Sequence, residues 1–158
     1  MTAVGKLNSQ PGTYAIVLRC LDENTVSIGR LGEFQLGKGH YIYIGSAFGA
    51  GGIRARVMRH HREEKARHWH IDYLREHMPM IEAWYTHDAE RREHRWVEVM
   101  TGMNLVSCLK GFGSSDCACY SHLFHVTAGP KISLFRAAVT RHIAGHDRIG
   151  VWAPNVRA

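Results

Sequence analysis

Two tripeptides and an arginine-rich segment carry side chains that could act on a phosphate group. The tripeptides are Gly-Thr-Tyr, ending at Tyr14, and Tyr-Ile-Gly, starting at Tyr43; Arg56 follows, with His60 one helical turn later. An arginine guanidinium is a planar fork of donors that suits a pair of phosphate oxygens. Histidine can accept a proton or orient a tyrosine, whose pKa of about 10 makes it a poor base unless a cation lowers that pKa.

The composition favours a single domain with a polyanionic partner. The chain has 158 residues, is 45% hydrophobic and carries a formal charge of +6. Lysine and arginine gain affinity by displacing counterions from phosphates. Basic residues follow the second tripeptide, and we expect these to contact nucleic acid: Arg54, Arg59, Arg62, Lys65 and Arg67. Acidic neighbours leave an ordinary solvated helix as the alternative.

Nothing in the chain resembles a membrane span or an export signal. No apolar run approaches the roughly 20 residues that cross a bilayer, and the first residues lack an apolar stretch. We therefore expect a cytoplasmic protein without a membrane partner, with reduced cysteines and not a disulfide framework.

A second cluster lies near the C-terminal third of the sequence. Cys117, Cys119 and His122 offer two thiolates and an imidazole, and Cys108 or His70 could complete a tetrahedral Zn²⁺ site. The alternative, which we favour from sequence, is that these side chains pack a glycine-rich loop. Just before them lie three polar residues that could hydrogen-bond a substrate backbone: Ser114, Ser115 and Asp116.

Hydrophobic periodicity predicts the elements that position these residues. Strands are expected at 13–19, 25–28, 33–36, 41–45, 81–85 and 122–126, and helices from 53, around 70–77, at 87–100 and at 134–144. An antiparallel meander is the simplest arrangement of the first four strands. From Arg148 onward we expect disorder.

The order of the motifs resembles the signature of the GIY-YIG nuclease superfamily. Three further stretches, at 68–74 (HWHIDYL), 111–117 (GFGSSDC) and 119–124 (CYSHLF), resemble an uncharacterised branch of it, whose members occur alone or attached to an endonuclease III domain of base-excision repair. The likeness covers roughly residues 10–127. Two departures are Thr13 in place of the usual isoleucine and a longer gap between the two tyrosines, which requires an extra hairpin.

This resemblance implies an active site and a cofactor. The matching catalytic residues are Tyr14, Tyr43, Arg56, His60 and Glu93. Glu93 is the residue that would hold one divalent cation, Mg²⁺ or Mn²⁺. The implied activity is hydrolysis of phosphodiester bonds, in DNA more than RNA, in repair or DNA processing, with a DNA-repair enzyme as a further partner.

The predicted architecture is therefore α+β, with a small, mainly antiparallel sheet flanked by helices. A nuclease-like domain is expected at 10–127 and a basic helix and tail at 128–158. Two other functions stay open: a non-catalytic nucleic-acid-binding module and a zinc-stabilised interaction domain. Taken singly, each tyrosine could be a strand residue, and Arg56 and Glu93 could be surface helix charges.

Overall fold

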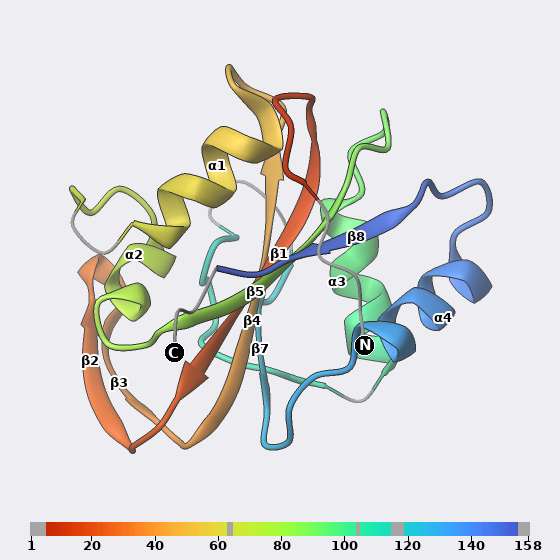
Figure 1. The fold of residues 1–158 in the computed structure, drawn as a ribbon. Coiled ribbons are helices and arrows are strands. Elements are labelled where there is room, and N and C mark those ends of the chain that lie inside the picture. Colours follow the sequence, from red (N-terminus) through yellow and green to blue (C-terminus); the bar gives the residue numbers. More distant parts are fainter. Residues whose placement is uncertain (1–5, 63–64, 104, 115–118, 155–158) are drawn as a thin grey trace.

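One antiparallel sheet organises the part of the chain that the computed structural model describes, residues 6–62, 65–103, 105–114 and 119–154 (Figure 1). Within these residues, six strands pair in the order β6-β7-β4-β1-β5-β8, and β2 and β3 form a separate two-stranded sheet. The strands are β1 (Gly12–Cys20), β2 (Asn24–Ile28), β3 (Gly32–Leu36), β4 (Gly39–Ala47), β5 (Met80–Thr86), β6 (Val106–Ser107), β7 (Leu123–Val126) and β8 (Ile149–Trp152). The helices are α1 (Gly52–His61), α2 (His70–Arg75), α3 (Glu93–Gly102) and α4 (Ile132–His142), with a short 3₁₀ turn η1 (Gly29–Leu31).

The two signature tripeptides lie side by side at the centre of this sheet. β1 pairs with β4 in a register that sets Tyr14 opposite Gly45 and Ile16 opposite Tyr43. β1 is central because its apolar run is buried almost throughout, which suits a strand covered on both faces. The antiparallel pairing brings both tyrosines onto the same face of the sheet.

The extra hairpin expected between the tyrosines is present as β2 and β3. The simple meander is wrong, because β1 pairs directly with β4 and the hairpin leaves the main sheet. Val26 and Ile28 are fully buried in the same core as Ile71 and Leu74 of α2. The alternating pattern of β2 is therefore satisfied by packing against a helix, without a place in the main sheet.

The side chains of β1 and β4 alternate between two hydrophobic cores. Tyr14, Ile16 and Tyr43 belong to the core that includes α1, α2 and the hairpin. Val17 and Ile44 point to the opposite core, which includes α3 and α4. Figure 1 shows these helix pairs on opposite sides of the sheet. The predicted α+β class with a mainly antiparallel sheet is confirmed.

Two boundaries differ from the sequence expectation. The helix predicted from His87 begins only at Glu93, because the Asp88 carboxylate caps a turn, accepting the Glu90 N–H at 3.0 Å and contacting the Arg92 guanidinium at 3.2 Å. The expected disorder after Arg148 is wrong for Ile149–Trp152, which form β8 and pair with β5. Among the described helices, none is both long and apolar enough to cross a membrane.

Candidate active site

A buried tyrosine and histidine form the centre of the candidate site. The Tyr14 hydroxyl lies 2.8 Å from Nε2 of His60, and the two ring centroids are 5.3 Å apart. Tyr14 comes from β1 and His60 from the last turn of α1, which packs on β1 through Ile53 and Val57. Both side chains are 1% exposed. The contact is therefore fixed by the packing of a helix on the central strand.

Burial sets the charge state of this pair. It raises the pKa of Tyr14 well above its usual value, and Arg56 opposes that rise by charge and by a hydrogen bond. Burial also lowers the pKa of His60 to about 3, aided by nearby cations including Arg56 and opposed by Asp72. At neutral pH the resting pair is therefore a neutral phenol beside a neutral imidazole, and neither side chain carries a charge.

Arg56 is held on the same side of α1 by two further contacts. Its Nη1 donates to the Ser46 carbonyl at 3.1 Å, and its guanidinium lies 4.5 Å from the centre of the Trp69 ring. A second guanidinium, that of Arg59, lies 4.2 Å from the centre of the same ring. Trp69 thus positions two guanidinium groups by cation–π contact.

Tyr43 lies beside His60 and under a loop. Its ring centroid is 6.1 Å from that of His60 and 5.8 Å from that of Phe112, both in edge-on geometry. Burial raises the pKa of Tyr43, with the Glu93 charge adding to the rise. The loop itself is anchored where the Gly113 N–H donates to Nδ1 of His70 at 2.9 Å. Tyr43, at 8% exposure, is nearly closed off from solvent.

Glu93 completes the group from the far side of the sheet. It is the first residue of α3, where the unpaired N–H groups and the helix dipole favour a carboxylate. Its charge acts on both Tyr14 and Tyr43, and its Oε1 lies 3.1 Å from Nδ1 of His122. Contacts therefore join Tyr14, His60, Arg56 and Tyr43, and Glu93 acts on both tyrosines through its charge, although the five residues come from four different elements.

Thr13 fixes the start of α3, a role that the sequence alone did not reveal. Its hydroxyl accepts the Arg92 N–H at 3.1 Å, directly before Glu93. Isoleucine and threonine are both β-branched and both suit a strand, so the replacement alone does not predict a change of role. The buried hydroxyl gives it a polar function, and the only signal in the sequence was the polar residue inside an apolar strand.

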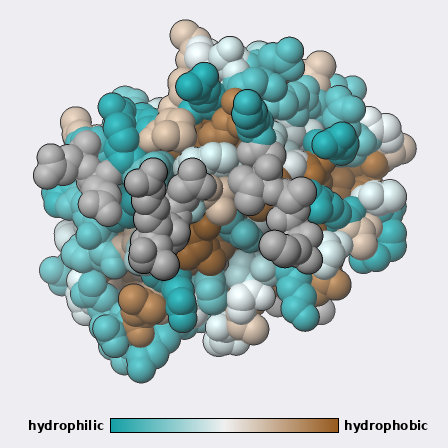
Figure 2. Space-filling model, viewed as in Figure 1, coloured by the Kyte–Doolittle hydropathy of each residue, from teal (hydrophilic) through white to brown (hydrophobic). Residues whose placement is uncertain are grey.

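The basic residues predicted to bind nucleic acid fall into two groups. Arg59 and Arg67 form ion pairs, Arg59 with both carboxylate oxygens of Asp72 at 3.0 Å and Arg67 with Glu76 at 2.6 Å. Lys65 donates to the carbonyls of His60 and Arg62 and so helps to end α1. Arg54 and Arg62 are exposed. On the face drawn in Figure 2, hydrophilic residues predominate and hydrophobic ones form separate patches.

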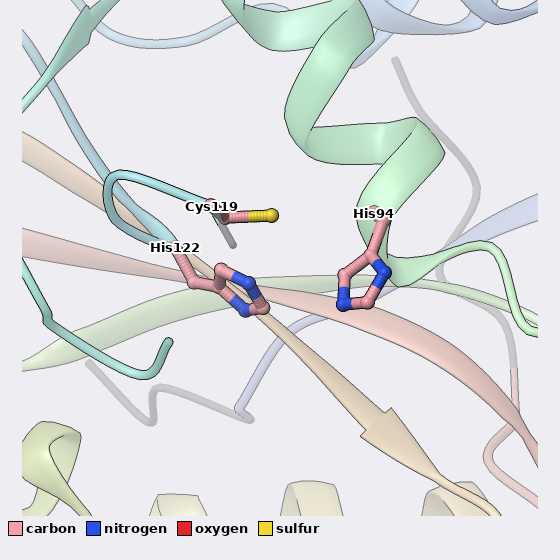
Figure 3. Close-up of side chains that lie close together, drawn as sticks. All are labelled: His94, Cys119 and His122. Atoms are coloured by element: carbon pink, nitrogen blue, oxygen red, sulfur yellow. The ribbon is translucent and has the colours of Figure 1, made fainter. Parts of the chain in front are cut away.

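The predicted cysteine cluster is only partly within the described residues. Cys117, Ser115 and Asp116 lie outside them, and Ser114 is buried with its hydroxyl 3.5 Å from the Tyr120 carbonyl. Cys119 and His122 come together with a residue that the sequence reading missed, His94 of α3 (Figure 3). Neither Cys108 nor His70, the expected fourth ligands, belongs to this group.

The site offers two kinds of donor for a metal. The Glu93 carboxylate, 22% exposed, is an oxygen ligand of the type that Mg²⁺ and Mn²⁺ prefer, and the contact with His122 uses only its Oε1. A single carboxylate with one oxygen outside that contact fits a cation that keeps most of its waters. The imidazoles and thiol beside it are softer donors that prefer other ions.

Comparison with protein families decides where the chain belongs. Residues 13–144 match the family described as domain of unknown function DUF123. The chain belongs to the DUF123 family. This is a GIY-YIG-like, nuclease-related family, and the matched region runs from β1 to the end of α4, so it includes the whole candidate site. Searches of curated proteins and of solved structures gave no match.

Proposed function

We propose that this DUF123 protein is a divalent-metal-dependent endonuclease that hydrolyses phosphodiester bonds in DNA. The observation that carries the proposal is the Tyr14 hydroxyl, 2.8 Å from a neutral His60 and hydrogen-bonded with Arg56, within the electrostatic influence of Glu93. Hydrolysis of a phosphodiester requires a proton acceptor for water, a cation for the phosphoryl oxygens and a carboxylate for a metal ion. The set supplies all three kinds of group.

Each residue has a distinct part in such a reaction. His60 orients the Tyr14 hydroxyl through Nε2, and it can accept the Tyr14 proton, as that hydroxyl takes one from the attacking water, once the negative charge of a bound phosphate raises the imidazole pKa from about 3. Arg56 presents its fork to two phosphoryl oxygens, which stabilises the charge that develops there. Tyr43 orients the imidazole through its ring edge. A cation held by Glu93 would stabilise the leaving oxygen.

The long-range charge suits a nucleic-acid substrate. A formal charge of +6, the exposed Arg54 on α1 and the exposed Arg62 directly after α1 would attract a phosphate backbone towards the helix that carries Arg56 and His60. The resemblance to a branch that also occurs attached to endonuclease III favours DNA over RNA and repair over other processing. It also makes a DNA-repair enzyme the partner that we propose.

One observation favours a second candidate, a nucleic-acid-binding module without cleavage. With Tyr14 at 1% and Tyr43 at 8% exposure, water and phosphate have little access to either hydroxyl in this conformation. Cleavage then requires the loop that carries Phe112 to move away from Tyr43. A protein that never opens would keep the basic surface and lose turnover.

The test is a panel of labelled single-stranded, duplex, abasic and branched DNA, with matching RNA, incubated with Mg²⁺ or Mn²⁺. The wild type should cleave at least one DNA, and Glu93→Gln should abolish cleavage while binding is kept or slightly strengthened, since one negative charge is removed. Glu98→Gln is the matched control, because Glu98 lies on the same helix with a 66% exposed side chain and should keep full activity.

Two outcomes contradict the proposal in different ways. Tight binding of DNA with no turnover of any substrate supports the second candidate. Equal cleavage by wild type and Glu93→Gln shows that another carboxylate, or none, supports the reaction.

A further inference from the structure

Three side chains beside the candidate active site meet in a way that their sequence positions do not suggest. His94 on α3, and Cys119 and His122 before β7, each offer one ligand atom, and these atoms all lie within 4.8 Å of one another. Figure 3 shows the Cys119 sulfur and the His122 ring reaching from the loop towards the His94 ring. Two imidazoles and a thiolate are the donors that Zn²⁺ prefers, whereas Mg²⁺ prefers oxygen.

His122 is held as a metal-binding histidine would be. Its main chain is fixed twice, because its N–H donates to the Phe112 carbonyl at 2.8 Å and its carbonyl accepts the Ile44 N–H at 3.0 Å. Its side chain is 1% exposed and contacts Oε1 of Glu93 through Nδ1 at 3.1 Å. A carboxylate beside one ring nitrogen is the usual outer-shell neighbour of a zinc-binding histidine, so Glu93 lies where it can orient this ring.

The residues that spacing alone suggested as further ligands have other roles. The Cys108 thiol donates to the Leu123 carbonyl at 3.7 Å, and burial raises the pKa of this thiol to about 12, so it stays protonated. Nδ1 of His70 accepts the Gly113 N–H at 2.9 Å. His94, by contrast, is an exposed residue whose ring centroid lies 5.8 Å from that of His122.

We infer that His94, Cys119 and His122 form a binding site for one Zn²⁺ ion, separate from the Mg²⁺ or Mn²⁺ proposed at Glu93. Three protein ligands leave one position of a tetrahedral ion for water or a further ligand. The ion would link the first turn of α3 to the segment before β7, two parts of the chain that the Glu93 contact and the His94–His122 ring contact already bring together. This inference does not depend on cleavage of nucleic acid.

The location gives the ion a consequence for its neighbour. Glu93 directly precedes one ligand and contacts another, so an ion bound at this position fixes both groups that flank its carboxylate. Zinc binding should therefore restrict the rotamers of Glu93 and stabilise the fold, because metal binding is coupled to the folded state.

Titration of the metal-stripped full-length protein with Co²⁺, without nucleic acid, tests the inference. A tetrahedral site with one thiolate should give intense visible ligand-field bands and a near-ultraviolet sulfur-to-cobalt band at one equivalent, both displaced by Zn²⁺. Cys119→Ser should lose the sulfur band. His94→Ala should weaken binding by at least roughly 100-fold, since loss of even an outer-shell partner costs 10–100-fold.

Matched variants control for the many other imidazoles and thiols of the chain. His142→Ala removes an exposed histidine at the end of α4, and Cys108→Ser removes a half-buried thiol outside the cluster. Both should bind Co²⁺ like the wild type. If Cys119→Ser does not fold, His94→Ala still decides the matter, because an exposed side chain can be removed with little effect on stability.

The inference is overturned by a weak, octahedral Co²⁺ spectrum, or by an affinity that His94→Ala leaves unchanged. Its failure is distinct from that of the proposed function. A tetrahedral cobalt site in a protein that cleaves nothing supports the zinc site alone, and Mg²⁺-dependent cleavage without any cobalt site overturns the zinc site alone.

Discussion

The two faces of the central sheet are built by opposite rules. On the face covered by α3 and α4, aromatic rings pack on one another: Phe135 lies 5.3 Å from Trp84 and 4.9 Å from Trp96, centroid to centroid. The indole N–H groups there are paired, Trp84 with Glu82 and Trp96 with His146, each at 2.9 Å. On the face covered by α1, the buried groups include Tyr14 and His60, which contact each other through Nε2 of His60, while Nδ1 of His60 is buried without a hydrogen-bond partner among the described residues. Buried polar groups destabilise a fold unless they are paired, so the second face keeps an unpaired imidazole nitrogen at a cost in stability.

The largest loss of stability is expected from a substitution in the apolar face covered by α3 and α4. Phe135→Ala should destabilise the protein by about 3–5 kcal/mol, because it removes a fully buried ring from the apolar face. Urea unfolding measures the change. Leu134→Ala, at a neighbouring side chain that is 59% exposed, should stay within about 0.5 kcal/mol. Similar losses for the two variants would show that α4 does not carry the core.

On the polar face the corresponding effect is on rate. Arg56→Ala should lower turnover by about 10²–10³-fold with a small change in stability, as expected for loss of a donor that stabilises transition-state charge. Single-turnover cleavage of the best substrate is the measurement. Arg54→Ala, two residues earlier and exposed, should reduce affinity and its salt dependence slightly while turnover is kept. Equal rate losses would assign both arginines to binding.

Substitution of Gly45 probes the contact between the two tripeptides. A Cβ at this position would lie 2.4 Å from the Tyr14 hydroxyl, so Gly45→Ala should destabilise the protein by about 1–3 kcal/mol and displace Tyr14 from His60. Combining it with Tyr14→Ala should remove most of the penalty, a non-additivity that unfolding measurements detect. Gly102→Ala has open space and should be neutral or stabilising. Additive losses in the double variant would place the clash elsewhere.

A smaller effect is expected where the polar face meets α3. Thr13→Val keeps the shape but removes the acceptor of the Arg92 N–H, which should destabilise the protein by about 1 kcal/mol and loosen the start of α3. Amide exchange at Arg92 reports the second effect. Thr140→Val, at an exposed hydroxyl of α4, is the matched control. Unchanged exchange at Arg92 would mean that Asp88 alone holds this turn.

The last prediction concerns pH. His60 has a pKa of about 3 when folded against 6.5 ordinarily, so between these values the unfolded chain binds a proton that the native protein does not. The stability that the neutral residue contributes is present above pH 6.5 and is lost as pH falls towards 3, by at most about 1.4 kcal/mol per pH unit. His60→Gln should flatten the slope of urea stability from pH 6.5 to 5. His142→Gln, at an exposed site, should not.

The sequence predicted an element correctly where the hydrophobic pattern within that element is enough to identify it. The alternation of β2 and β3, the apolar run of β1 and the stripe of α1 identify these elements without reference to the rest of the chain. It failed where distant residues decide. The pairing of β1 with β4 depends on the hairpin packing against α2, and the start of α3 depends on the buried Asp88.

The candidate site shows the same division. Motif order identifies Tyr14, Tyr43, Arg56, His60 and Glu93, and the structure shows contacts among the first four and an effect of the Glu93 charge on both tyrosines. His94 was missed because its neighbours in sequence are surface charges, and only the fold turns it towards His122. The sequence shows a threonine inside the first strand, but its role depends on the Arg92 N–H, which only the fold brings to its hydroxyl.

The close approach of Tyr14 to Gly45 has a consequence for how related sequences should vary. The two tripeptides are far apart in the sequence, yet the Tyr14 ring of the first fills the space beside Gly45 of the second. The same sheet repeats the arrangement at its other side, where a Cβ at Gly150 would lie 2.7 Å from the Tyr85 ring across β5 and β8. Relatives in which either tyrosine is replaced by a small residue should be free to lose the facing glycine, so the members of each pair are expected to change together during evolution.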